Sequence, residues 1–220
     1  MNSKDHIIFV VDDNSRIREA LFELLSSLDL RVVTFGSAAE YIEFPKPDLP
    51  ACLILDVKLP GINGLDLQSQ IADTDHPPIV FITGHGDIPS SVRAIKAGAV
   101  DFLTKPFNQQ DLLEAIHAAV AQDRKARQER AELFQLQQRY ASLTHREREV
   151  LSLVVSGLLN KQAAAELGIS LVTLQLHRSK VMQKMAAKSF AELVRMAAQL
   201  RVPLTSLPVD NARPVSSGDR

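Results

Sequence analysis

The sequence predicts a doubly wound α/β domain with a five-stranded parallel sheet, followed by a helical linker and an all-α domain that contains a helix-turn-helix. Short apolar runs alternate with helical patterns as far as residue 121, which is typical of repeated βα units. From residue 122 to residue 140 the composition changes to strong helix formers without proline or glycine. Nearer the C-terminus, the tight turn at residues 168–170 separates two helical segments.

The first domain is expected to contain five strands and five helices in alternation. Ser37 and Glu40 form a predicted capping box at the start of one helix, and Gly98 is expected to end another. Such an alternation favours a parallel sheet with helices on both faces. The strands are expected at residues 7–11, 31–35, 52–55, 79–82 and 100–103, and the helices at residues 15–28, 38–44, 64–72, 88–97 and 109–121.

Residues 122–141 are expected to form a helical linker. Leu133, Leu136, Tyr140 and Leu143 recur at spacings of three and four, so they would share one face of a helix. That face could pair two chains as a short coiled coil, or it could pack against the chain's own domains. The sequence leaves both alternatives open.

The second domain is predicted from its helix boundaries. Residues 160–167, the turn at 168–170 and residues 171–186 form the predicted helix-turn-helix, whose second helix normally enters the major groove of DNA. Capping boxes and glycines mark the starts and ends of its helices, namely Thr144 with Glu147, Ser189 with Glu192, Gly157 and Gly168. The expected domains are 1–121 for the α/β domain, 122–141 for the linker, 142–201 for the helix-turn-helix domain and 202–220 for a disordered tail.

The composition is that of an ordinary globular protein. Hydrophobic residues make up 45% of the chain and charged residues 23%. No apolar run approaches the roughly 20 residues that a membrane helix needs, and the N-terminus lacks the apolar stretch of a signal peptide. We therefore expect a cytoplasmic protein with no membrane contact. The one cysteine, Cys52, is expected to be a small buried hydrophobe.

The net charge of −1 conceals an uneven distribution. Residues 1–121 contain 9 Lys and Arg against 17 Asp and Glu, a net charge of −8, whereas residues 122–220 contain 16 against 9, a net charge of +7. A basic second half is suited to a polyanion such as nucleic acid, and an acidic first half can gather carboxylates around a cation. Charge alone also allows two solvated surfaces of opposite sign.

Polar residues close the apolar runs of the first domain. Asp12 and Asp13 follow IIFVV, Asp56 follows CLIL, Thr83 follows PIVFI and Lys105 follows VDFLT. In an open parallel sheet, ligands bind outside the carboxyl ends of the strands, so these residues can converge on one pocket. Aspartates would provide oxygen ligands for Mg²⁺, and the lysine would neutralise an anion. The pattern predicts phosphoryl transfer onto one of the aspartates.

The segments FVVDDN, LDVKLPGINGLDL, FITGHGD and AVDFLTKPF resemble the receiver domain of bacterial two-component response regulators, in order over residues 7–121. The resemblance implies a flavodoxin-like fold in which Asp56 accepts a phosphoryl group from a phosphohistidine of a sensor histidine kinase. It also implies that Asp13 ligates Mg²⁺ directly and that Asp12 does so mainly through water. The backbone carbonyl of Lys58 would complete the protein ligands.

The same resemblance implies how the phosphoryl group is recognised. Lys105 would pair with its oxygens, and Pro106 would follow a cis peptide bond. Phosphorylation adds about −1.5 to −2 charges and strong acceptor oxygens, so the Thr83 hydroxyl would move inward. Phe102 would rotate into the space that Thr83 leaves. The face made by the fourth helix, fifth strand and fifth helix would then change shape and pair with a second chain.

The segments LTHREREVLSLVVSGLLNKQAAAELGIS and LVTLQLHRSKVMQKMAAKSFAELV resemble the LuxR-type helix-turn-helix, here in the FixJ-like arrangement behind a receiver. Ala163 stands where the family commonly carries isoleucine and Gln175 where many members carry lysine, which leaves target sequence and affinity open. Glutamine can pair with adenine, and leucine can touch a thymine methyl group. The residues expected to face the groove are Thr173, Gln175, Leu176 and Ser179, and those expected to contact phosphates are Asn160, Lys161, His177, Arg178, Lys180 and Lys184.

The predicted function is that of a DNA-binding response regulator in a two-component phosphorelay. Pairing of phosphorylated receivers would bring two helix-turn-helix units onto two half-sites of double-stranded promoter DNA, which raises their effective concentration. RNA polymerase is an expected partner, and the resemblance favours activation of transcription over repression. The chain would be a phosphoacceptor and not a turnover enzyme.

Two other functions compete with this one. An aspartyl-phosphate phosphohydrolase also holds a nucleophilic aspartate and Mg²⁺ in an α/β pocket, but its nucleophile closes the first strand in a DxD motif. Here Asp12 and Asp13 are adjacent, and the candidate nucleophile lies on the third strand. An RNA-binding antiterminator with a receiver is disfavoured by the turn at residues 168–170 and the helix that follows it.

Overall fold

The computed structural model of the chain describes residues 5–84 and 88–203. The chain divides into two compact units, Met1–Glu129 and Arg130–Arg220. Of the tail predicted at residues 202–220, only Val202 and Pro203 belong to the described residues, and the rest of that prediction lies outside them. None of the helices in the described part of the chain has the length and apolar character to cross a membrane.

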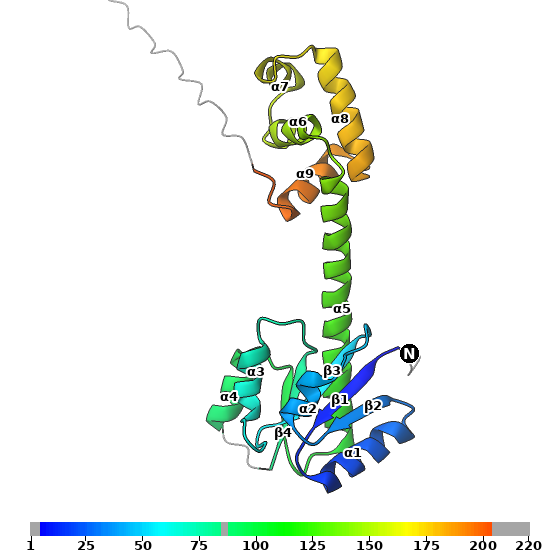
Figure 1. The fold of residues 1–220 in the computed structure, drawn as a ribbon, viewed down its shortest axis with the longest axis vertical. Helices are drawn as coiled ribbons and strands as arrows, with labels where there is room; N and C mark the ends of the chain where they lie inside the picture. The colour runs from blue at the N-terminus through cyan, green and yellow to red at the C-terminus, as the bar shows by residue number, and fades with distance from the viewer. Residues whose placement is uncertain (1–4, 85–87, 204–220) are drawn as a thin grey trace, which may run out of the picture. The chain divides into compact units, whose positions relative to one another are not determined.

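The first unit is built on five parallel strands, which are β1 (Ile7–Val11), β2 (Arg31–Phe35), β3 (Ala51–Asp56), β4 (Ile79–Thr83) and β5 (Asp101–Thr104). Their order in the sheet is β2-β1-β3-β4-β5 (Figure 1). All residues of β1, β3 and β4 are buried, as expected for strands with helices on both faces. The predicted five-stranded parallel sheet is confirmed, and each strand end lies within one residue of its predicted position.

Helices cover both faces of this sheet, namely α1 (Ser15–Ser27), α2 (Ala38–Glu43), α3 (Gly64–Ile71), α4 (Ile88–Lys96) and α5 (Gln109–Ala141). Successive residues of a strand point to opposite faces, so each strand contributes to two cores. In β1, Phe9 packs in a core with α2, α3 and α4, whereas Val10 packs in a core with α1 and α5. The doubly wound architecture follows from this division.

Helix α5 joins the predicted fifth helix and the predicted linker in one uninterrupted element. Leu112 and Ile116 belong to the core beneath the sheet. Beyond residue 121, the buried Asp123 carboxylate accepts the N–H of Ala51 at 2.8 Å and pairs with Arg127 Nε at 2.8 Å. These contacts fasten α5 to the start of β3 several residues past the predicted end of the first domain.

The second unit contains the C-terminal part of α5 with α6 (His145–Val155), α7 (Asn160–Glu166), α8 (Leu171–Met185) and α9 (Phe190–Gln199). Gly168 has a φ of +62°, a conformation that favours glycine, and it lies in the turn between α7 and α8. The Ser170 side chain accepts the N–H of Thr173 and caps α8. The predicted helix-turn-helix is therefore present at the predicted residues.

The three predicted capping boxes form in two versions. At Thr144, both hydrogen bonds with Glu147 are made. Glu40 and Glu192 donate their N–H groups to Ser37 and Ser189, but their carboxylates accept the N–H of the residue before the cap. The two serine caps have φ near −150°, compared with −65° at Thr144, and this more extended backbone accompanies the shifted bond.

The apolar face predicted on the linker lies mostly within the second unit. Leu136, Tyr140 and Leu143 belong to its core with residues of α8 and α9, whereas Leu133 is 40% exposed. This packing favours the alternative in which the face contacts the chain's own domain. Pairing of two chains through this helix remains a prediction.

Candidate functional site

Three aspartates lie together at the carboxyl ends of β1 and β3. Carboxylate oxygens of Asp12, Asp13 and Asp56 lie within 4.8 Å of one another. β1 and β3 are neighbours, with Val11 opposite Leu55, so the residues that follow them reach the same edge of the sheet. Asp12 is fully buried, Asp56 is 7% exposed and Asp13 is exposed. The cluster therefore opens to solvent on the side of Asp13.

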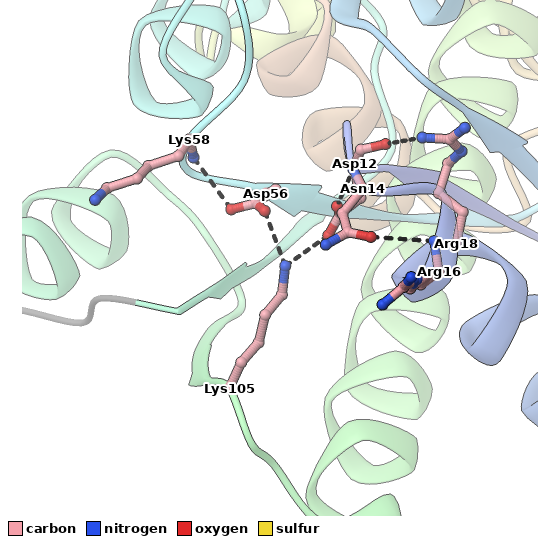
Figure 2. Close-up of polar contacts among 7 residues, drawn as sticks. All are labelled: Asp12, Asn14, Arg16, Arg18, Asp56, Lys58 and Lys105. Carbon is pink, nitrogen blue, oxygen red and sulfur yellow. Dashed lines mark hydrogen bonds and ion pairs between the residues drawn. The ribbon is translucent and has the colours of Figure 1, made fainter.

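Lys105 lies between two of these carboxylates (Figure 2). Its Nζ atom is 2.6 Å from Oδ2 of Asp12 and 2.8 Å from Oδ2 of Asp56. Burial raises the pKa of Asp12, and the hydrogen bond from Lys105 offsets part of that effect. Burial alone would lower the pKa of Lys105, but its bonds to both carboxylates outweigh burial and raise it. The ammonium group therefore stays charged at neutral pH.

The turns after β1 and β3 hold the remaining carboxylate oxygens (Figure 2). The N–H of Asn14 donates to Oδ1 of Asp12 at 2.9 Å, and the N–H of Lys58 donates to Oδ1 of Asp56 at 3.1 Å. Arg18 of α1 donates from Nη1 to the carbonyl oxygen of Asp12 at 2.7 Å. The sequence prediction missed Arg18, because nothing in its local pattern distinguishes it from a solvated arginine. Asn14 could have been predicted from the sequence, because it directly follows the aspartate pair and is the N-cap residue of α1.

The loop between β3 and α3 approaches the site closely. A Cβ atom at Gly64 would lie only 2.4 Å from the carbonyl oxygen of Asp56, a distance at which the backbone must shift. The N–H of Gly64 donates to the carbonyl of Val57 at 2.8 Å. Only glycine allows α3 to begin this near to Asp56, and the sequence prediction did not identify this role.

Thr83 and Phe102, the two predicted switch residues, lie on neighbouring strands. Thr83 ends β4 and is fully buried, and its carbonyl accepts the N–H of Lys105 at 2.7 Å. Phe102 of β5 lies opposite Phe81, with ring centroids 6.2 Å apart, and packs half-buried against the core beside α4. The Lys105-Pro106 peptide bond is cis, as the resemblance implies.

The predicted groove residues lie between the first turn and the middle of α8. Gln175, Leu176 and Ser179 are exposed, and Leu176 keeps 55% of its accessible surface. Thr173 is half-buried, and its hydroxyl lies 2.8 Å from the hydroxyl of Ser170. Val172, which the sequence prediction did not select, is 75% exposed on the same part of the helix.

The six predicted phosphate contacts differ in their surroundings. Lys161 and Lys180 are exposed. Arg178 donates to the Asn160 side chain at 2.7 Å, and Lys184 lies 2.6 Å from a carboxylate oxygen of Glu147. His177, the sixth, is half-buried, and its covered Nδ1 atom has no hydrogen-bond partner among the residues that the structure describes.

Comparison with known families adds two matches that together span most of the chain. Residues 8–117 match the response regulator receiver domain, and residues 141–197 match the luxR family of bacterial regulatory proteins. The chain belongs to the two-component response regulators. A response regulator of this composition is a transcriptional regulator with a receiver and a LuxR-type DNA-binding domain, and phosphorylation by a histidine kinase is typical of its family.

Named relatives support this assignment over nearly the whole chain. Nodulation protein W of Bradyrhizobium diazoefficiens is 49% identical, covering 89% of this chain and 87% of that protein. Response regulator protein TmoT of Ectopseudomonas mendocina is 44% identical, and the match covers 91% of this chain and 92% of that protein. Among solved structures, response regulator StyR has a TM-score of 0.78 at 47% identity, and the match covers 89% of this chain and 99% of that structure's chain. Full-length FixJ from B. japonicum has a TM-score of 0.52 at 38% identity, and the match covers 90% of this chain and 97% of that structure's chain.

The acidic cluster of this response regulator is typical of the Mg²⁺ site of receivers. Carboxylates are the ligands that a hard cation prefers, and Asp13 lies at the exposed side of the cluster. The cluster combines these oxygens with a fixed ammonium group. This combination can bind a cation and an anion side by side.

Proposed function

We propose that Asp56 is the phosphoacceptor of this response regulator. The observation that carries the proposal is the placement of Asp56 and Asp12 on either side of the Lys105 ammonium. An oxygen of Asp56 forms the new bond to phosphorus while the bond to the kinase histidine breaks and the imidazole leaves. Such a transfer depends on positioning and on charge neutralisation, and the site offers both.

Asp12, Asp13, Asp56 and the backbone carbonyl of Lys58 would hold Mg²⁺. When bound, the ion offsets the negative charge on the phosphoryl oxygens. The chain's own residues do the remaining work. The N–H of Lys58 holds one oxygen of Asp56, and Lys105 is positioned to exchange its carboxylate partners for the incoming phosphoryl oxygens.

Thr83 and Phe102 change position in response to the phosphoryl group. The Thr83 hydroxyl moves toward the phosphoryl oxygens, and Phe102 turns inward into the space beside β4. Because Phe102 packs against the core shared with α4, its rotation changes the face formed by α4, β5 and α5. Two chains then pair through that face. The exposed apolar residues Ile88, Val92 and Ile95 of α4 support such pairing.

The dimer binds two half-sites of promoter DNA through α8 of each chain. Gln175, Leu176 and Ser179 face the major groove, with Thr173 at the edge of this group, while Lys161 and Lys180 contact phosphates. Bound in this way, the regulator recruits RNA polymerase and activates transcription in the cytoplasm. The protein acts as a stoichiometric phosphoacceptor and not as a turnover enzyme.

Phosphorylation with a small phosphodonor tests the acceptor directly. Wild-type protein incubated with Mg²⁺ and acetyl phosphate should gain the mass of one phosphoryl group, and Asp56→Asn should gain none. Asp66→Asn is the matched control, because Asp66 is exposed on α3 and its ion pair, with Arg93 at 3.2 Å, is exposed as well. Full phosphorylation of the Asp56 variant would overturn the assignment.

A further inference from the structure

Two of the basic side chains on the DNA-binding surface are already bound to protein groups. Lys161 and Lys180 are exposed and have no hydrogen-bond or ion-pair partner in the described residues. Arg178 and Lys184 instead contact side chains of other helices. These four cations therefore do not form one uniform phosphate-binding set.

Lys184 joins the end of α8 to the start of α6. Its Nζ atom donates to Oε2 of Glu147 at 2.6 Å and to the carbonyl oxygen of Ser142 at 3.2 Å. The same Oε2 atom accepts the N–H of Thr144 at 2.8 Å, as part of the capping box of α6. Lys184 thus connects three points of the second unit: the last turn of α8, the first turn of α6 and the residue that follows α5.

Releasing Lys184 toward a DNA phosphate would be costly. The Glu147 side chain is only 4% exposed, and the hydrogen bond from Lys184 is the first cause of its lowered pKa. Glu147 is therefore charged at neutral pH. A buried carboxylate that loses its cation keeps the desolvation penalty without the compensating attraction. The lysine side chain is held by this pairing.

Arg178 joins the middle of α8 to two other helices. Nη1 of Arg178 donates at 2.7 Å to the side-chain oxygen of Asn160, the first residue of α7. The guanidinium carbon lies 4.9 Å from the ring centroid of Phe190, the first residue of α9. A planar guanidinium that donates at one edge and stacks on a ring is fixed in orientation as well as in position.

We propose that Arg178 and Lys184 are positioning residues that fix the orientation of α8, and that the phosphate contacts of this surface come from Lys161 and Lys180. The inference rests on the DNA-binding surface proposed above and divides its cations into two groups. Members of the first group act on DNA only through the geometry of α8. Members of the second group act through their charge.

The salt dependence of binding separates the two roles. A plot of the logarithm of the binding constant against the logarithm of the salt concentration has a negative slope. The magnitude of this slope decreases by about 0.9 for each phosphate contact that is removed. Binding of the full chain to a fluorescein-labelled DNA duplex of arbitrary sequence would be followed by anisotropy over a range of salt concentrations. Lys161→Gln and Lys180→Gln should each reduce the slope by about 0.9 and leave the melting temperature unchanged.

Arg178→Gln and Lys184→Gln should keep the wild-type slope, lower the melting temperature and weaken binding by the same factor at every salt concentration. A double variant, Glu147→Gln with Lys184→Met, controls for loss of binding through unfolding. It removes both charges of the buried pair, so no unpaired carboxylate remains. It should melt above the Lys184→Met single variant and keep the wild-type slope.

Opposite results are distinguishable. A slope reduced by about 0.9 in Arg178→Gln or Lys184→Gln at unchanged melting temperature would overturn the positioning role. Unchanged slope, affinity and melting temperature in these two variants would overturn it as well. If Lys161→Gln and Lys180→Gln also keep the full slope, the proposed DNA-binding surface itself is wrong.

Discussion

Lys105 is the residue on which the charge balance of the receiver site depends. It donates to two carboxylates that come from different strands, and only 16% of its side chain is exposed. Without a cation between them, Asp12 and Asp56 would repel one another in a partly desolvated pocket. The same lysine therefore stabilises the site and prepares it to accept an anion.

Lys105→Met should lower the free energy of unfolding by about 3 kcal/mol when Mg²⁺ is absent, because a buried carboxylate loses its cation. Saturating Mg²⁺ should raise the melting temperature of this variant more than that of the wild type, since the ion binds the folded carboxylates. Thermal unfolding with Mg²⁺ or with a chelator measures both effects. Lys96→Met, at an exposed position on α4, serves as the control. Equal Mg²⁺ responses in all three proteins would contradict this expectation.

Glu147 makes the stability of the second unit depend on pH. Its pKa is lowered in the folded protein, first of all by Lys184. The stabilisation is therefore complete above the ordinary value of 4.5 and is lost as pH falls through the lowered pKa. Urea unfolding of wild type and Glu147→Gln should show a difference in stability that shrinks as pH drops below 4.5. The exposed Glu166→Gln is the control, and a difference that stays constant with pH would rule out the lowered pKa.

Single residues of the receiver site were predictable where they close strands. Asp12, Asp56 and Lys105 each follow an apolar run, and a parallel sheet brings such positions together. Arg18 and Gly64 could not be identified in this way. Their roles depend on a carbonyl group of another segment, and a backbone carbonyl has no sequence signature.

At the scale of elements, the start of α3 is set by its distance from β3. Gly64→Ala would bring a Cβ atom to 2.4 Å from the Asp56 carbonyl, so the helix start or the strand end must move. The expected cost is about 1–3 kcal/mol, measured by urea unfolding. Gly36→Ala should be nearly neutral, because the three atoms nearest its added Cβ all belong to the Arg18 side chain and lie no closer than 3.6 Å. Equal stability of the two variants would argue against the close approach.

The extension of α5 past residue 121 is a second structural element of the first unit. Asp123→Ala would leave the N–H of Ala51 without its acceptor and Arg127 without one of its two carboxylates. The expected loss is about 1–3 kcal/mol in the free energy of unfolding. Glu129→Ala tests an exposed position on the same helix and should have little effect. A neutral Asp123 variant would show that this contact contributes nothing to stability.

The bounds of strands and helices were predicted well where the local sequence pattern determines them. β1 and β2 have the predicted bounds, because their apolar runs stand between clear helix and turn signals. The continuity of α5 was missed. The composition changes at residue 122, but helix propensity does not, and the contact that fastens Asp123 joins residues 72 positions apart.

At the scale of the whole molecule, the proposed function requires two chains. Sedimentation velocity with Mg²⁺ and beryllofluoride, a phosphoryl mimic, should show a shift from monomer to dimer in the wild type. Asp56→Asn should remain a monomer under the same conditions. An unchanged mass in every sample would contradict pairing of the receivers, whereas a dimer in every sample would indicate constitutive association.

The two-part organisation was visible in the sequence, because charge and composition both change between the halves. The alternation of strands and helices predicted a parallel sheet, and the tight turn at residues 168–170 between two helical segments predicted the helix-turn-helix. The sequence did not predict which basic side chains of α8 bond to other groups of the protein. Lys184 and Glu147 lie 37 residues apart, and only the packing of α8 on α6 brings them together.

Asp12 and Lys105 lie 93 residues apart in the chain, and 49 residues separate Asp56 from the same lysine. A chain emerging from the ribosome exposes both aspartates well before the lysine, which follows the last strand of the sheet. Until that strand is added, the pocket lacks its fixed positive charge. Under the proposed role of Asp56, a chain whose synthesis has not yet passed β5 carries the phosphoacceptor without the ammonium group that would pair with the phosphoryl oxygens.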